Sequence, residues 1–440
     1  MRSGEICSGE AVCRSGRADD VADAARASLD AWPGDYGLEF AYGGSSRMPV
    51  RSARGVQTCA PASASSRARG GERPRRRAQG PFGGRLAVRR LLAGAAFACL
   101  ALFPVGALSA SYTMTIAHLY PDDLTNNETA PALKHFEQLV ETATKGDIDV
   151  QVFGNGALGG EVEIAQQARA GRTIQSIMLG SGTQATFFRD YEMITSPFLF
   201  PDYRTAWTFF DSPWFAKFMK PMVQEAGLRY LGTLDDGGGF VAFANNKRLI
   251  RTVEDLKGMR IRVEGNQAHM TIMRALGAAP TPLPWGEMQT GLATGLIDGH
   301  FHAPGVNDIF KIYDVADFTT WSGHVYNTIT WSVSEAWFQT LPDDYKRIVV
   351  SAAREAVTMA HGIATQITVI GWTNSCAKFE DCYILPDEEK ERMRAIAQPI
   401  YREWLVEEFG PRAKLYDDLR AEVSRIHGKL KASDAENYLD

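Results

Sequence analysis

The chain has 440 residues, 45% of them hydrophobic, so it is long and apolar enough for two or more domains with sizeable cores. Its formal net charge of -5 hides two unlike parts: residues 1–90 hold 16 Arg, no Lys and 9 acidic residues, whereas residues 111–440 hold 31 basic and 43 acidic residues. Because the basic segment precedes an acidic remainder, a nucleic-acid-binding arm is disfavoured.

Residues 1–90 are rich in Ser, Gly, Ala and Arg, with the run RPRRR at 73–77. This composition buries too little apolar surface to fold, and it predicts a disordered segment or one absent from the mature protein. We also expect the true start of translation to lie downstream of Met1, because 90 residues are too many for the basic part of an export signal.

Residues 91–110 resemble a secretory signal peptide. They are apolar and uncharged, they follow Arg89 and Arg90, and they end in small residues, so cleavage is expected near Ser109 or Ala110. The stretch is also long enough to span a bilayer, and an uncleaved anchor is the alternative.

Two cysteines, Cys376 and Cys382, remain after such a cleavage. In an oxidising periplasm a pair this close in sequence can form a disulfide. Two unpaired buried thiols are the alternative. A metal site at the cysteines would need further ligands, and the neighbouring sequence offers none.

The mature chain is predicted to open as strand, helix, strand. The strand Tyr112–His118 is followed by a helix from Pro131 to about Gly146 and by the strand Asp149–Phe153.

A G-x-G-x-x-G sequence at 154–159 then precedes a predicted helix over Glu161–Ala170, as in a dinucleotide-binding fold. The next strand, Ser176–Leu179, ends without the carboxylate that would hold a ribose, so a tight turn is favoured over an NAD site. Ser181 lies between two glycines where backbone N–H groups at a helix start can meet an anion, and it is a candidate ligand-binding residue.

The middle of the chain is predicted to form helices through Trp207 and over Phe215–Ala226, then a strand over Arg229–Thr233. The sequence DDGGG at 235–239 is expected to break regular structure as a hinge, because three glycines are entropically costly unless the chain must bend. A strand over Phe240–Ala244 then enters a second domain.

The segment Gly258–Asn307 has the pattern strand, helix, strand-like turn, helix, strand, as in a ligand-binding βαβ unit. It places the cation of Arg262 on a strand and Trp285 on a loop after two prolines. His300 and His302 share one face of the last strand. These two histidines, with His118 or His324 as a third ligand, are a weaker candidate for a transition-metal site.

The rest is predicted as a helix over Val306–Val315, a return strand over Thr328–Ser334, a long helix over Asp343–Thr373, a short strand at 382–385 and helices after Pro386. The expected division is domain I at 111–238 and 328–366, domain II at 239–327, and C-terminal helices at 367–440 packing across both.

Four segments together resemble one family, the C4-dicarboxylate-binding periplasmic solute-binding proteins of tripartite ATP-independent (TRAP) transporters. They are GNGALGGEVEIAQQARAG at 154–171, ITSPFLFPDY at 194–203, VEDLKGMRIRV at 253–263 and ALGAAPTPLPWGEMQTGLATGLIDG at 275–299. The resemblance covers about residues 111–410. It implies an α/β clamshell of the two-domain periplasmic-binding-protein type (class II-like), which closes over an organic acid and delivers it to membrane subunits.

The resemblance assigns Arg262 to the arginine that pairs with the ligand carboxylate, and a guanidinium matches a carboxylate in shape and charge. The alternative is an ion pair with Glu264. The sequence also departs from the family: Ala242, between Phe240 and Phe243, stands where a second arginine is usual, and His302 replaces an asparagine. These changes favour a monocarboxylate, such as an aromatic or branched oxo acid, or a zwitterion whose cation stacks on Trp285.

We therefore expect a monomeric periplasmic binding protein with no catalytic residues, no cofactor and no nucleic-acid partner. Its expected partners are a small organic acid and the TRAP membrane subunits. An exported metal-dependent enzyme using His300 and His302 is one alternative, and a periplasmic sensor input protein is another.

Overall fold

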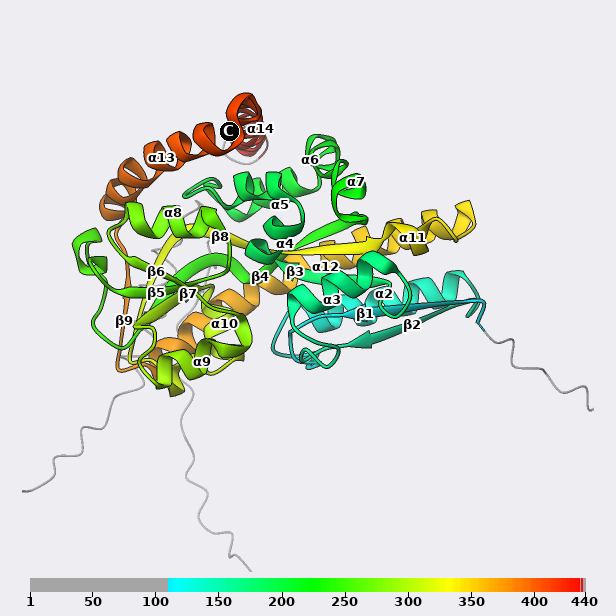
Figure 1. Cartoon of the computed structure of the whole chain (residues 1–440), viewed down its shortest axis with the longest axis horizontal. Helices are drawn as coiled ribbons and strands as arrows, with labels where there is room; N and C mark the ends of the chain where they lie inside the picture. Colours follow the sequence, from blue (N-terminus) through cyan, green and yellow to red (C-terminus); the bar gives the residue numbers. More distant parts are fainter. Residues whose placement is uncertain (1–109, 436, 438–440) are drawn as a thin grey trace, which may run out of the picture. The chain divides into compact units, whose positions relative to one another are not determined.

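The computed structural model describes residues 110–435 and 437, which belong to one compact unit (Figure 1). The basic segment 1–90 and residues 91–109 of the predicted signal peptide lie outside the described residues. Among the described residues, no helix is both long and apolar enough to cross a bilayer.

Nine strands in the described part of the chain form one mixed sheet in the order β2-β1-β3-β8-β4-β7-β5-β6, with β9 beside β8. The first strand group pairs in parallel and consists of β1 (Tyr112–Ala117), β2 (Ile148–Phe153) and β3 (Ser176–Gly180). The second strand group is also parallel and consists of β5 (Arg260–Val263), β6 (Ala279–Pro282) and β7 (Gly299–His302). Parallel strands need helical crossovers, and the predicted strand and helix alternation supplies them.

Two long strands, β4 (Leu228–Asn245) and β8 (Phe318–Ser334), join the two groups. The first half of β4 pairs with the second half of β8, which lies beside β3. The second half of β4 pairs with β7 and with the first half of β8. The sequence predicted only the second half of β8, at Thr328–Ser334.

The expected break at 235–239 is wrong, because β4 runs through it with a register shift between Asp235 and Phe240. Gly237, Gly238 and Gly239 have φ angles of 60, 106 and 75°, which are unfavourable for residues with a side chain. A Cβ at these positions would collide with Val306, Thr368 or Tyr326. The glycines therefore bend the strand and allow close packing without ending it.

The chain between β1 and β4 contains the helices α2 (Thr129–Ala143), α3 (Glu161–Ala170), α4 (Ser181–Phe187), η1 (Arg189–Thr195) and α5 (Tyr203–Phe210). The single helix predicted over Phe215–Ala226 is two, α6 (Pro213–Met219) and α7 (Met222–Ala226). Pro221 separates them, because it has no N–H to continue the helical hydrogen bonds.

The chain between β4 and β8 contains the helices η2 (Val253–Leu256), α8 (Gln267–Ala275), α9 (Trp285–Ala293), α10 (Pro304–Ile309) and η3 (Ile312–Asp314). The helix predicted over Val306–Val315 is interrupted, because Lys311 has a φ of 52° and separates α10 from η3. Trp285 is the first residue of α9, so its predicted loop position is wrong. Pro284 is the N-cap, a position that tolerates a missing N–H.

After α11 (Glu335–Phe338), the long helix α12 (Asp343–Lys378) contacts α2, β4 and α10 (Figure 1). A disulfide between Cys376 and Cys382 joins the end of α12 to β9 (Asp381–Ile384), with the two Cα atoms 5.3 Å apart.

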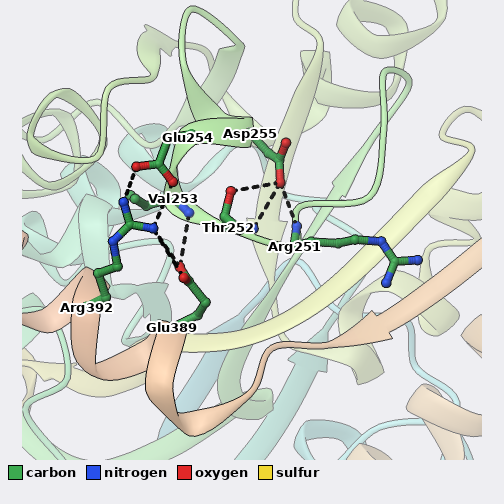
Figure 2. Close-up of polar contacts among 7 residues, drawn as sticks. All are labelled: Arg251, Thr252, Val253, Glu254, Asp255, Glu389 and Arg392. Carbon is green, nitrogen blue, oxygen red and sulfur yellow. Dashed lines mark hydrogen bonds and ion pairs between the residues drawn. The ribbon is translucent and has the colours of Figure 1, made fainter.

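The C-terminal helices are α13 (Asp387–Phe409) and, after η4 (Gly410–Ala413), α14 (Lys414–Asp434). Helix α13 packs on α8, whereas α14 packs on α5. Arg392 of α13 forms an ion pair with Glu254 of η2, and Glu389 accepts a 3.4 Å hydrogen bond from the backbone of Val253 (Figure 2). The last two helices thus contact elements that precede β4 in the chain as well as elements that lie between β4 and β8.

Candidate ligand-binding site

A small cavity of about 40 Å³ lies between the two strand groups. Its walls come from the turn after β1, from α3, from the strands β3, β4, β5, β7 and β8, and from α9 and α10. A neighbouring groove of about 540 Å³ shares five of its residues and opens toward solvent between α3 and the loop before α9. The residues lining the cavity are His118, Leu119, Tyr120, Glu161, Met178, Gly180, Asp236, Arg262, Glu264, Trp285, His302, Val306, Phe310 and Ile329.

Arg262 contributes a buried guanidinium to this cavity. The residue is 3% exposed, and its Nε donates a 2.8 Å hydrogen bond to the carbonyl of Leu283. Its neighbours Ile261 and Val263 are fully or almost fully buried on the other face of β5, which fixes the direction of the Arg262 side chain. Within residues 110–435, neither a carboxylate within 4 Å nor any hydrogen-bond acceptor pairs with its two terminal nitrogens.

The charge of Arg262 persists despite this burial. Burial lowers the pKa of Arg262, while Glu264, Glu161 and Asp236 oppose the shift, and an arginine stays protonated in proteins. A buried cation without a close partner is unfavourable, so the geometry favours an anionic ligand at this point. The ion pair with Glu264 that the sequence left as an alternative is not formed.

Trp285 covers the guanidinium from α9. The Cζ atom of Arg262 lies 5.8 Å from the centroid of the indole. The indole also makes edge contacts with His302 and Phe310, each at a centroid distance of 4.9 Å. This aromatic wall restricts the position of a group bound to Arg262.

Three carboxylates complete the polar lining, and the sequence analysis missed them as site residues. Glu161 begins α3, Asp236 lies in β4, and Glu264 directly follows β5. Asp236 accepts a hydrogen bond from the hydroxyl of Tyr120, and burial raises the pKa of Asp236. Only the position of Glu264, two residues after Arg262 and just past the end of β5, was a usable signal.

Glu161 and Glu264 approach each other at Gly180. The backbone N–H of Gly180 and the hydroxyl of Thr183 each donate a 2.6 Å hydrogen bond to Glu161. A Cβ added to Gly180 would lie 3.2 Å from Oε1 of Glu161 and 3.4 Å from Oε1 of Glu264. Burial, and then the charge of Glu264, raises the pKa of Glu161 to about 7.

Glu264 is the more acidic member of this pair. Burial opposes its ionisation, but His302, His269 and Arg262 outweigh burial and lower the pKa of Glu264 to about 2. Its Oε2 atom is buried without a hydrogen-bond partner among the described residues.

The histidines predicted as ligand-binding or metal-binding residues divide into those that line the cavity and those that do not. His118 and His302 line the cavity, whereas His300 lies behind His302, with 3.0 Å between their Nδ1 atoms. His324 stacks on Phe243 at 4.4 Å. No set of three His, Cys, Asp or Glu side chains in the described part of the chain is placed to hold a metal ion, so the metal alternative gains no third ligand.

The other predicted site residues lie outside the cavity wall. Phe240 packs between Tyr203 and Tyr326 at 4.9 and 4.8 Å and borders a different groove. Phe243 lies in the core between His324 and Phe301. Ser181 is buried at the start of α4, one residue beyond the cavity-lining Gly180. Phe240 and Phe243 pack among other aromatic rings and do not line the cavity. The expectation of an apolar ligand-binding wall beside Ala242 is therefore wrong.

Comparison with known proteins identifies the family. Residues 123–408 match the model of the DctP family, bacterial extracellular solute-binding protein, family 7. The chain belongs to this family. Its members are solute-binding proteins, so the match confirms the family predicted from the four sequence segments.

Individual relatives agree with this assignment. The 2,3-diketo-L-gulonate-binding periplasmic protein YiaO of Escherichia coli is 29% identical over 225 residues, which cover 51% of this chain and 67% of that protein. The ectoine-binding periplasmic protein TeaA of Halomonas elongata is 31% identical over 217 residues, covering 48% of this chain and 61% of TeaA.

Solved structures show the same fold. The galactonate complex of the sugar acid binding protein of Advenella mimigardefordensis has a TM-score of 0.67 and 24% identity, covering 72% of this chain and 99% of that one. A TRAP periplasmic solute-binding protein of Polaromonas bound to D-erythronate has a TM-score of 0.64 and 25% identity, covering 70% of this chain and 98% of that one. The predicted two-domain α/β fold is thus confirmed.

Proposed function

We propose that this protein captures a small organic acid in the periplasm and delivers it to the membrane subunits of a TRAP transporter. The observation that carries the proposal is the buried guanidinium of Arg262, whose terminal nitrogens have no acceptor among the described residues. A ligand carboxylate would accept both hydrogen bonds in a forked pair.

Relatives with printed ligands support an acid as the solute. YiaO is named for 2,3-diketo-L-gulonate, and the solved structures contain galactonate and D-erythronate. Each of these ligands has a carboxylate. The apolar and aromatic remainder of the cavity, including Trp285, Phe310 and Ile329, would exclude water around that carboxylate and strengthen its pairing with Arg262.

Transport would follow from closure of two domains around the solute. The proposed domains are 111–238 with 328–366 and 239–327, joined by β4 and β8, with 367–440 packing across both. Since the cavity takes residues from both strand groups, a bound solute favours the closed arrangement. The proposed role is binding without catalysis, as in the family.

Calorimetric titration with a panel of small carboxylic acids tests the proposal. Arg262→Ala should weaken binding of every acid that the wild type holds by at least about a hundredfold, the effect expected for a buried charge-assisted pair. Arg274→Ala, which removes an exposed arginine from α8, is the matched control. Unchanged affinity in Arg262→Ala would refute the carboxylate anchor.

A further inference from the structure

The acidic lining of the cavity restricts the class of acid that can bind. Three carboxylates, Glu161, Asp236 and Glu264, face the same space as the single guanidinium of Arg262. A solute whose only charge is a carboxylate would add another negative charge to this enclosed site. Charges in such a space are poorly screened, so the added repulsion is larger than in water.

Two of these carboxylates, Glu161 and Glu264, come from opposite sides of the cavity and meet at Gly180. Glu161 belongs to α3, beside the first strand group, and is held by Gly180 and Thr183. Glu264 follows β5 of the second strand group and approaches the same glycine, with Oε2 unpartnered among the described residues. Two carboxylates that share one space need a proton or a cation between them.

We infer that the solute carries a protonated amine or amidine in addition to its carboxylate, and that this cation binds between Glu161 and Glu264. The inference rests on the proposed function, because the carboxylate of the same solute occupies Arg262. A cation there satisfies the free oxygen of Glu264 and removes the repulsion between the two side chains. Since these residues come from opposite strand groups, the cation also stabilises the closed arrangement.

The protonation of the two glutamates agrees with this assignment. Burial, and then Glu264, raises the pKa of Glu161 to about 7, so the pair retains a proton near neutral pH when no cation is present. The other charged or titratable groups around the pair are Arg262, Asp236, His269 and His302, and Nε2 of His302 lies 3.8 Å from Oε1 of Glu264. A bound ammonium takes the place of that shared proton.

A calorimetric comparison of matched acids tests the inference. The probes are 4-aminobutyrate with 4-hydroxybutyrate, 5-aminovalerate with 5-hydroxyvalerate, and serine with glycerate. Each pair differs by an amine in place of a hydroxyl, which can donate a hydrogen bond but has no charge. The wild type should bind the amine member of at least one pair tenfold or more tightly than its partner.

Two variants locate the cation. Glu161→Gln keeps an oxygen to accept from Gly180 but loses the charge, so it should remove at least tenfold of the affinity for the amine member, whereas the affinity for the hydroxyl member should stay the same or rise because one repelling charge is gone. Glu264→Gln should act in the same way from the opposite side. Glu355→Gln, which removes an exposed charge of α12, is the matched control and should change neither.

The outcomes separate the inference from the proposed function. Hydroxyl members that bind as tightly as amine members, with both weakened by Arg262→Ala, would overturn the cation site and leave the carboxylate anchor intact. Failure of both members of every pair to bind would contradict acid binding itself, and the cation site with it. The comparison within the wild type does not depend on whether a variant folds.

Discussion

Glu161 and Glu264 lie against the same face of Gly180, although they are separated by about a hundred residues and belong to opposite sides of the cavity. An alanine at position 180 would crowd Glu161, because its Cβ would lie 3.2 Å from Oε1 of that residue, and it would touch Oε1 of Glu264 at 3.4 Å. Gly182, the second residue of α4, makes a second close approach to Glu264. The glycines therefore set how closely the two strand groups meet.

We expect Gly182→Ala to hinder this close approach. Its added Cβ would collide with Oε2 and Cβ of Glu264 and with Nδ2 of Asn266. Since Gly182 lies in a helix, alanine is locally tolerated, and the melting temperature should change by only a few degrees. The dissociation constant for a bound acid should rise at least about tenfold, and small-angle scattering should show a more open protein.

Gly362→Ala is the control for that variant. Gly362 lies within α12, and a Cβ there meets nothing within 4 Å. It should raise stability by about 0.5–1 kcal/mol without changing affinity. Wild-type affinity in Gly182→Ala would show that contact between α4 and Glu264 is not needed for binding.

A second prediction concerns Glu128, a fully buried carboxylate beneath the bend of β4. Its Oε1 accepts a 2.8 Å hydrogen bond from the N–H of Gly237, but its Oε2 has no partner among the described residues. Burial, together with Asp235 and Asp236, raises the pKa of Glu128 from 4.5 to about 8. The folded protein therefore binds a proton that the unfolded chain releases above pH 4.5.

The sign of the pH dependence follows from this difference. Stability from the protonated Glu128 is fully present below pH 4.5 and is lost as the pH rises to 8. Glu128→Gln removes the charge and keeps an acceptor for Gly237. In urea unfolding at pH 8, the free energy of unfolding of this variant should therefore exceed that of the wild type by about 2–4 kcal/mol. The gain should disappear at pH 4.5, where both proteins are uncharged at this position. If the variant and the wild type differed in unfolding free energy by the same amount at both pH values, the raised pKa of Glu128 would be refuted.

The disulfide gives a third prediction. The bond between Cys376 and Cys382 closes a short loop between α12 and β9. By restricting the unfolded chain, a disulfide across such a loop adds about 2 kcal/mol to the free energy of unfolding. The double variant Cys376→Ser, Cys382→Ser should therefore melt several degrees lower than the oxidised wild type. A reductant should lower the melting temperature of the wild type to that of the variant and leave the variant unchanged; an insensitive wild type would argue against the bond.

The sequence predicted the fold more completely than the site. Strands such as β1 and helices such as α3 follow directly from apolar spacing, and four segments identified the family. The bend at 235–239 was misjudged, because glycine content alone does not distinguish a break from a bulge within a continuing strand.

The sequence predicted only part of the site, because several of its contacts form only in the folded protein. Arg262, Trp285, His302 and His118 do line one cavity, but Phe240 and Phe243 do not. The roles of Glu161 and Asp236 depend on contacts with Gly180 and Tyr120, residues that come near them only when the sheet forms. No local pattern in the sequence encodes such pairs, because a helix start and a strand carry carboxylates for many other reasons.

The most direct test of the central claim is the dissociation constant of Arg262→Ala, measured by calorimetry for the acid that stabilises the wild type most in a thermal-shift panel. A buried guanidinium that anchors the carboxylate predicts a loss of at least about a hundredfold, with Arg274→Ala unchanged. Equal affinity in Arg262→Ala and the wild type would contradict the account.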